Sequence, residues 1–444
     1  MSLGNAGEQR LTMRHFCWFL VVVSVSYGAH LRLACYLKTI VDSPIRADAA
    51  DYYQYAKNLA ESRIFSRQSV ANPSLELPRP DAVRSPGFPY FASLFFASSP
   101  TDSLRNTLLA QTVLQTFSFG LMTILLIRLL GLRWSLPGIF LLWTFPHFVS
   151  INTYYLSESL FTSLLALFIV LFWYVSKDDF RSTPGAVACG LVLGLAWLVR
   201  PVVEFLPWLL LLCFVVRAKK SAVVFFASAM LPIIAWKVRN LLVLGAPSDS
   251  LVMYTSLYHG SFVDFMYEGD KKSLGIPYRF DPREREIDSL QSTLRVIFER
   301  ASASPREYLN WYLFGKQTFL WRWDILAGFG DIFIYPVVFS PYFLFSDMQF
   351  SHALNKIIHP FWVNVGLLSA FLLIIRMRTL YARIAPVWLA MALIVVYAAL
   401  VHAVLAPFPR YGIPFKLFLI PLSIYAIKGV FEWLGSISGK RQSP

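Results

Sequence analysis

A series of about ten apolar segments constrains the fold of this chain more than any other feature. A helix of about 20 apolar residues crosses a bilayer, and in lipid the backbone polar groups are satisfied only within helices or closed barrels. The chain of 444 residues is 56% hydrophobic, with a mean hydropathy of +0.54. We therefore predict an all-α polytopic membrane protein, with spans at roughly 16–37, 106–130, 134–152, 158–176, 185–199, 202–216, 221–243, 357–375, 384–405 and 416–434.

The basic residues predict the orientation of these spans. The net charge is +14, but the basic residues are scattered between apolar segments, so we expect no nucleic-acid partner. Short loops on one side are rich in Lys and Arg, for example at 128–133 and 217–220. Because such loops stay inside, both termini are predicted to be cytoplasmic, in a cell inner (plasma) membrane.

Three regions follow from this topology. Residues 1–243 form an N-terminal transmembrane catalytic module that includes a first outer loop, 38–105. Residues 244–356 form an outer (periplasmic) loop region with amphipathic helices, one of them over 284–301. Residues 357–444 form C-terminal transmembrane helices.

The segment 46–59, directly after the first span, carries two carboxylates and two tyrosines in helical spacing. At 100° per residue, Asp48, Asp51, Tyr52 and Tyr55 share one face of the predicted helix. Acids at the start of a helix also suit its exposed N–H groups. The segment is therefore either a candidate site outside the membrane or an amphipathic loop helix with capping acids.

Four arginines fall at the predicted outer boundary, against the general charge bias. Arg84 precedes Ser-Pro-Gly-Phe-Pro, Arg200 precedes a proline, Arg239 closes a span, and Arg410-Tyr411 lies between the last two spans. The planar fork of a guanidinium suits phosphate, whereas an isolated arginine at this depth can simply snorkel to lipid head groups.

Two further residues are candidates for substrate contact. Glu158 opens the fourth span, where it either orients Arg84 or contacts a sugar, or else serves as a helix-start acid capped by Ser157. His259, in the second outer loop, either contacts substrate or a divalent ion or is a surface histidine. The chain has no Cys/His metal spacing, and we expect no metal and no cofactor.

Taken together, the order of these motifs resembles the integral-membrane glycosyltransferases of the C-type fold. The branch that holds lipid A aminoarabinose transferases and protein O-mannosyltransferases is the most similar. The resemblance implies that Asp48, the first acid of the first outer loop, is the catalytic carboxylate, with Asp51 as the alternative. It also implies that Arg84 lies near the donor phosphate. Ala49 stands where relatives often have Glu, at a position that the resemblance links to the choice of donor or acceptor.

The resemblance implies a hexosyl- or pentosyltransferase that uses a polyprenyl-phosphate-linked sugar, with undecaprenyl phosphate as the carrier in a bacterium. The acceptor is a lipid, a glycan or a protein at the outer face of the membrane. An Asp general base and a single displacement would invert the anomeric centre. The predicted donor-phosphate and substrate contacts are Arg84, Tyr52, Tyr55, Glu158, Arg200, Arg239, Arg410, Tyr411 and His259.

Two other classes of function compete with this hypothesis. A secondary transporter or lipid flippase for a lipid-linked substrate would also carry charges at membrane depth. Transporters usually have paired repeats, which this sequence does not show. A non-enzymatic scaffold would leave the face with acids and tyrosines on segment 46–59 without a purpose.

Overall fold

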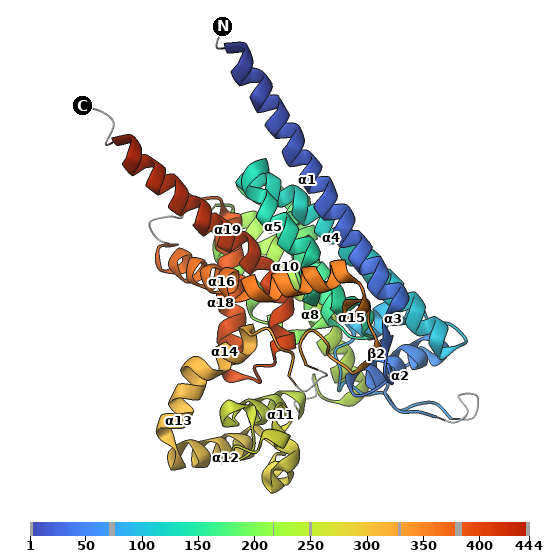
Figure 1. The fold of residues 1–444 in the computed structure, drawn as a ribbon. Coiled ribbons are helices and arrows are strands. Elements are labelled where there is room, and N and C mark those ends of the chain that lie inside the picture. The colour runs from blue at the N-terminus through green and yellow to red at the C-terminus, as the bar shows by residue number, and fades with distance from the viewer. Residues whose placement is uncertain are drawn as a thin grey trace.

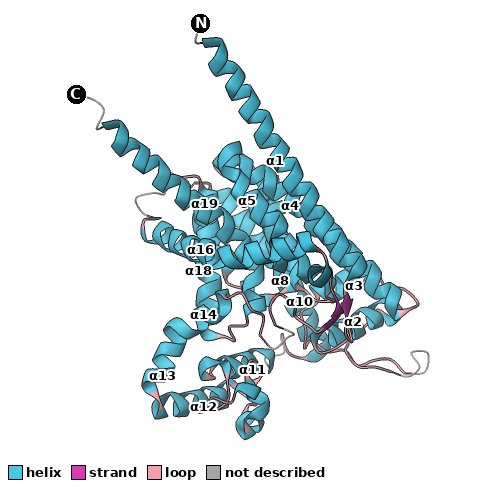
Figure 2. Cartoon of the chain, in the orientation of Figure 1, coloured by secondary structure: helices cyan, strands magenta, loops and turns pink. Residues whose placement is uncertain are grey.

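The protein is almost entirely helical in its computed structural model, which describes all residues except 1–2, 71–75, 216, 248–250, 327–329, 378–383 and 441–444 (Figures 1 and 2). Seven helices in the described part of the chain are long and apolar enough to cross a membrane. They contain the following residues: α1 (Leu3–Lys38), α4 (Pro100–Leu130), α7 (Glu158–Ser176), α10 (Lys219–Leu244), α16 (Ser346–Ile375), α18 (Pro386–Val404) and α19 (Pro409–Lys440). The chain is thus a multi-pass membrane protein.

The expected number of ten spans is not confirmed, although each predicted apolar segment contains a helix in the part that the structure describes. An eighth span results if α5 (Leu132–Thr144) and the segment Pro146–Thr153, which begins with α6 (Pro146–Ser150), count as one across a bend of 41°. The predicted spans 185–199 and 202–216 are the shorter apolar helices α8 (Thr183–Val199) and α9 (Leu206–Val215). A proline disfavours the helical conformation for the residue before it, and the backbone of Arg200, just before Pro201, is accordingly extended.

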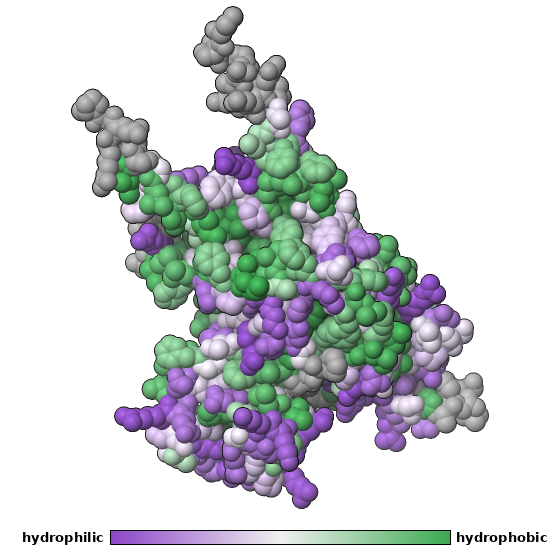
Figure 3. Space-filling view, in the orientation of Figure 1, coloured by the Kyte–Doolittle hydropathy of each residue, from purple (hydrophilic) through white to green (hydrophobic). Residues whose placement is uncertain are grey.

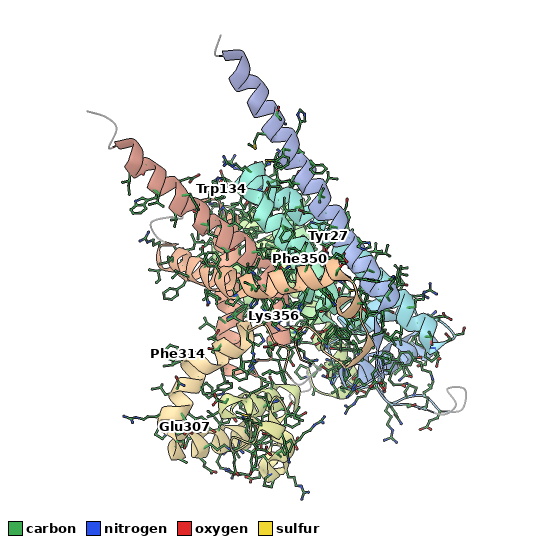
Figure 4. The ribbon with its side chains drawn as sticks, viewed as in Figure 1. Tyr27, Trp134, Glu307, Phe314, Phe350 and Lys356 are labelled. Carbon is green, nitrogen blue, oxygen red and sulfur yellow. The ribbon has the colours of Figure 1, made fainter. Side chains whose placement is uncertain are left out.

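Helix packing brings together the helix ends that carry the charged residues. α8 packs along α10, and α7 contacts both α4 and α8. A Cβ atom at Gly194 of α8 would lie 2.6 Å from the carbonyl oxygen of Ala229 in α10, so only glycine permits this approach. α16 packs on α19 and reaches α1, where the hydroxyl of Tyr27 donates to the carbonyl oxygen of Asp347 at 2.9 Å (Figure 4).

The first loop folds into two short helices beside the bundle. α2 (Asp48–Ser62) begins at the acid expected to open it, and α3 (Gly87–Ser93) packs against α2. A two-stranded antiparallel ribbon joins this loop to the second one through β1 (Ile40–Val41) and β2 (Val337–Phe339). Both helices lie toward the end of the molecule away from the termini (Figure 1).

The second loop region consists of short helices. These are α11 (Leu251–Gly260), α12 (Leu290–Ala303), α13 (Pro305–Asn310), a π-helical turn (Trp311–Gly315), α14 (Lys316–Trp321) and α15 (Pro341–Leu344). Hydrophilic residues gather at the end formed by α11 and α12, whereas the bundle surface is largely apolar (Figure 3).

The helix predicted over 284–301 begins later than expected. Ser289 caps α12 by accepting from the backbone N–H of Ser292, whose side chain in turn accepts from the backbone N–H of Ser289. The preceding residues, Pro282–Glu286, form a separate 3-10 turn. At the other side of this region, α16 already begins at Ser346, so the boundary expected at 356 falls inside a helix.

Candidate functional site

Six charged side chains from well-separated parts of the chain form one ion-pair cluster. Its members are Asp48, Asp51, Arg84, Glu158, Arg200 and Arg410. Three carboxylates face three guanidinium groups, so the ion-pair cluster is formally neutral. Four of the six lie at a helix terminus: Asp48 and Glu158 are the first residues of α2 and α7, Arg200 is the C-cap of α8, and Arg410 is the second residue of α19.

Asp48 is the centre of the ion-pair cluster because its two oxygen atoms are held by different arginines. Arg84 Nη2 lies 2.8 Å from Oδ1, and Arg410 Nη2 lies 2.7 Å from Oδ2. Ala47, just before α2, has a φ of 47°, which residues with a side chain rarely adopt. A contact from the second loop supports this turn, since the hydroxyl of Tyr335 donates to the carbonyl oxygen of Arg46 at 3.2 Å.

Arg84 connects the two aspartates of α2. Its Nε lies 2.9 Å from Asp51 Oδ2, and its Cζ lies 6.0 Å from the centre of the Tyr52 ring. The residue lies just before α3, whose Gly87 closely approaches the end of α8. A Cβ atom at Gly87 would lie 2.7 Å from the backbone of Leu198 and Val199. This close docking places Arg84 in the same neighbourhood as Arg200.

Glu158 anchors the other half of the ion-pair cluster. It is the first residue of α7, its side chain is 3% exposed, and it lies 2.8 Å from Arg200 Nη1 and 4.0 Å from Arg410 Nε. The guanidinium groups of Arg200 and Arg410 lie 4.8 and 5.2 Å from the centre of the Tyr411 ring. Ser157 makes no capping hydrogen bond, so the helix-capping alternative for this segment is wrong in that respect.

The electrostatic surroundings keep Asp48 ionised. Burial alone would raise the pKa of its carboxyl group, but the positive charges of Arg410 and Arg84 lower it to about 2. Burial and the negative charge of Asp48 raise the pKa of the Tyr52 hydroxyl. Such a group of arginines can bind an anion with paired hydrogen bonds, and a carboxylate released from them can accept a proton.

Tyr55 and Arg239 make their contacts in a neighbouring group around Asp81. The Tyr55 hydroxyl donates to Asp81 Oδ1, and the Tyr55 ring stacks on Phe65 with ring centres 4.2 Å apart. Arg239 Nη1 donates to the carbonyl oxygen of Asp81 at 3.1 Å, and its guanidinium lies 5.0 Å from the centre of the Trp236 ring. Their predicted contact with substrate remains a prediction.

His259 lies in α11, behind the ring of Phe408. Its Nε2 donates to the carbonyl oxygen of Gly275 at 3.0 Å, and its ring stacks on Phe265. Burial lowers its pKa to about 4, so the ring is neutral at pH 7. The centre of the Phe408 ring lies 4.9 Å from the centre of the His259 ring and 5.6 Å from Cζ of Arg410.

Sequence reasoning missed two residues that the structure brings to this region, Tyr335 and Asp81. Nothing in the sequence distinguishes Tyr335 from the other members of a set of 21 tyrosines. Asp81 has a weak signal, because it lies three residues before Arg84 in a polar, proline-containing stretch.

The ion-pair cluster already contains a cation between its two neighbouring aspartates, the guanidinium of Arg84. Among the residues that the structure describes, no group of three or more His, Cys, Asp or Glu side chains could hold a metal ion.

Comparison with solved structures supports the fold. No protein-family model and no curated protein matches the chain. The archaeal oligosaccharyltransferase AglB from Archaeoglobus fulgidus, in complex with an inhibitory peptide and a dolichol-phosphate, matches with a TM-score of 0.50 and 14% identity over 97% of this chain and 52% of that chain. ArnT from Cupriavidus metallidurans bound to undecaprenyl phosphate matches with a TM-score of 0.44 and 12% identity over 92% of this chain and 60% of that chain.

The chain thus spans about half the length of the archaeal enzyme. The match shows a shared fold and confirms the C-type glycosyltransferase fold that the sequence motifs implied.

Proposed function

We propose that this chain, which has the fold of the C-type membrane glycosyltransferases, moves a sugar from a polyprenyl-phosphate-linked donor to a lipid, glycan or protein acceptor. The observation that carries the proposal is Asp48, an ionised carboxylate held between two guanidinium groups beside the membrane-spanning bundle. The sugar is a hexose or a pentose, and undecaprenyl phosphate is the carrier if the cell is bacterial.

The arginines supply the binding site for the donor phosphate. The archaeal neighbour was solved with a dolichol-phosphate, which is a polyprenyl phosphate. Here Arg84, Arg200 and Arg410 converge from three parts of the chain, but each already pairs with a carboxylate. A phosphate therefore binds by taking guanidinium hydrogen bonds away from a carboxylate. Asp48 is the main competitor, because it accepts hydrogen bonds from both Arg84 and Arg410.

This exchange prepares the base. A carboxylate with a pKa of about 2 is a poor proton acceptor, but its pKa rises as the guanidinium groups turn to the phosphate. Asp48 then takes the acceptor's proton as the acceptor atom bonds to the anomeric carbon. The bond between that carbon and the phosphate oxygen breaks, and the arginines neutralise the departing phosphate.

The remaining residues of the site have supporting roles in this scheme. Asp51, which shares Arg84, is the alternative base. Glu158 holds Arg200 in place, and the rings of Tyr52 and Tyr411 provide surfaces for the sugar. A single displacement by one base inverts the anomeric centre.

A transfer assay tests the proposed function. Purified full-length protein in detergent receives a panel of polyprenyl-phosphate donors with radiolabelled sugars, beside the variant Asp48→Asn. The expected result is labelled product, or slow hydrolysis of the donor, with the wild-type protein alone. If the folded wild-type protein leaves every donor unchanged, the enzyme proposal is wrong and a transporter or flippase becomes the better hypothesis.

We also propose that the ion-pair cluster faces the outer side of the inner membrane and that both termini are cytoplasmic. In support, the ends of α1 and α19 that lead to the termini are at one end of the molecule, and α11 and α12 are at the other (Figure 1). Reporters inserted at residues 60 and 280 should both read as extracytoplasmic. A cytoplasmic signal from either position would place Asp48 on the side away from a flipped lipid donor.

A further inference from the structure

Asp81, in the first loop outside the ion-pair cluster, has a hydrogen-bond partner at both carboxylate oxygen atoms and at its backbone N–H and carbonyl groups. Its Oδ1 accepts from the Tyr55 hydroxyl of α2 and from the backbone N–H of Val83, the latter at 3.2 Å. Its Oδ2 accepts from the backbone N–H of Arg67 at 2.9 Å. One carboxylate thus ties together α2 and two separate stretches of the loop.

The backbone of Asp81 is held as well. Its N–H donates to the carbonyl oxygen of Phe65 at 3.1 Å, and its carbonyl oxygen accepts from Arg239 of α10 at 3.1 Å. The guanidinium of Arg239 lies 5.7 Å from the centre of the Phe65 ring, and that ring stacks on Tyr55. Asp81 is therefore fixed relative to a short helix and to a membrane-spanning helix at the same time.

These contacts fix the position of the Arg84 backbone. Arg84 follows Asp81 by three residues, and the intervening Val83 donates its N–H to the same carboxylate. Tyr55 follows Asp51 by about one helical turn on α2, so one rigid element presents both the acid that pairs with Arg84 and the hydroxyl that holds Asp81. The Tyr55 hydroxyl also lies beside the backbone N–H of Arg84.

We infer that Asp81 is a positioning residue for Arg84: by joining Tyr55, Arg67 and Val83, it fixes the backbone from which the Arg84 guanidinium reaches the donor phosphate. Because a long side chain on a loosened loop must be ordered at the moment of binding, releasing this anchor weakens phosphate binding through Arg84 alone. The inference rests on the proposed function, since it assigns the phosphate of the donor to Arg84.

A double-mutant cycle on ligand binding tests the inference without depending on catalysis. The probe is undecaprenyl phosphate, and its Kd is measured for the full-length wild-type protein, Asp81→Asn, Arg84→Ala and the double variant in the same detergent. We expect Asp81→Asn to weaken binding about 3- to 10-fold, as for one lost hydrogen bond, and Arg84→Ala about 10- to 100-fold. The double variant should bind no more weakly than Arg84→Ala.

Matched variants separate positioning from a general loss of structure. Asp102→Asn changes an exposed aspartate at the start of α4, whose partner is Ser99, and should leave the Kd unchanged. Asp81→Glu keeps the charge and should recover part of the affinity. If Asp81→Asn unfolds, Tyr55→Phe removes only the hydroxyl that anchors the carboxylate, and it completes the same cycle with Arg84→Ala.

The outcomes distinguish the two proposals. Wild-type protein that does not bind undecaprenyl phosphate overturns the proposed function and this inference together. Binding that depends on Arg84 but is unaffected by Asp81→Asn, or losses that add independently in the double variant, overturns the positioning role alone.

Discussion

Replacing Asp48 by asparagine should lower the rate of sugar transfer by about 10²- to 10⁴-fold, the usual contribution of a general base. The amide has nearly the size of the carboxylate but cannot take the acceptor's proton. Two guanidinium groups, those of Arg84 and Arg410, lose a negative partner in the variant. Donor phosphate should therefore bind at least as tightly as in the wild type. Single-turnover transfer and donor Kd, measured side by side, check both halves of this prediction.

Asp51→Asn is the matched control, because it removes a neighbouring carboxylate that pairs with only one of these arginines, Arg84. The rate of sugar transfer by this variant should fall by no more than about 10-fold, which corresponds to an increase of about 1.4 kcal/mol in the activation free energy. If Asp51→Asn is inactive while Asp48→Asn retains most of its activity, Asp51 is the base, and the assignment has to move by one turn along α2.

Replacing Glu158 by alanine should give the largest loss of stability in the site, about 3–5 kcal/mol, because it leaves Arg200 without its partner. The Glu158 side chain is 3% exposed and that of Arg200 is 17% exposed, so water cannot readily solvate the remaining charge. Thermal unfolding of the purified protein in a single detergent measures the change, with the midpoint expected to fall by several degrees.

Glu204→Ala provides the comparison, since it removes the glutamate of an ion pair with a lysine that is much more exposed. Glu204 lies 2.6 Å from Lys237, but the two side chains are 36% and 39% exposed. Exposed pairs contribute about 0–1 kcal/mol, so this variant should unfold close to the wild-type temperature. Equal losses for Glu158→Ala and Glu204→Ala would show that the Glu158–Arg200 pair is not the buried anchor of the ion-pair cluster.

Under the proposed function, the neutrality of the ion-pair cluster links donor binding to catalysis. Without ligand, each arginine is compensated by a carboxylate, so Arg84, Arg200 and Arg410 do not face one another as unscreened positive charges. The same pairing keeps Asp48 a weak base until an anion competes for its partners. Binding of the donor phosphate and activation of the base would then be one event, which limits proton abstraction in the absence of donor.

Local sequence was a good guide to elements and a partial guide to the site. The acid at position 48 does open a helix, and the charged candidates Asp48, Asp51, Arg84, Glu158, Arg200 and Arg410 do meet. These residues were recognisable because an ionisable side chain next to an apolar span is costly unless it has a partner. The pairing itself could not be read, since any of the carboxylates could neutralise any of the arginines.

The structure differs from the sequence-based predictions where packing between distant segments determines the contacts of a side chain. Tyr55 has the helical spacing of the site residues, but the loop around Asp81 folds over it and takes its hydroxyl. Arg239 was expected at the same membrane level as the other arginines, but its guanidinium faces Phe65 and Trp236. Helix spacing fixes the direction of a side chain on its own helix, but it carries no information about which distant segment covers that face.

By itself the sequence determined the class of the protein: apolar length requires membrane-spanning helices, and charges beside them mark the place where chemistry is possible. Only the tertiary structure decided which charges meet, that Glu158 belongs to Arg200, and that Tyr335 reaches the turn before Asp48 from 289 residues away. The physical reason is range. Hydrophobicity and helix geometry act within a segment, whereas a guanidinium finds its carboxylate only after the helices have packed.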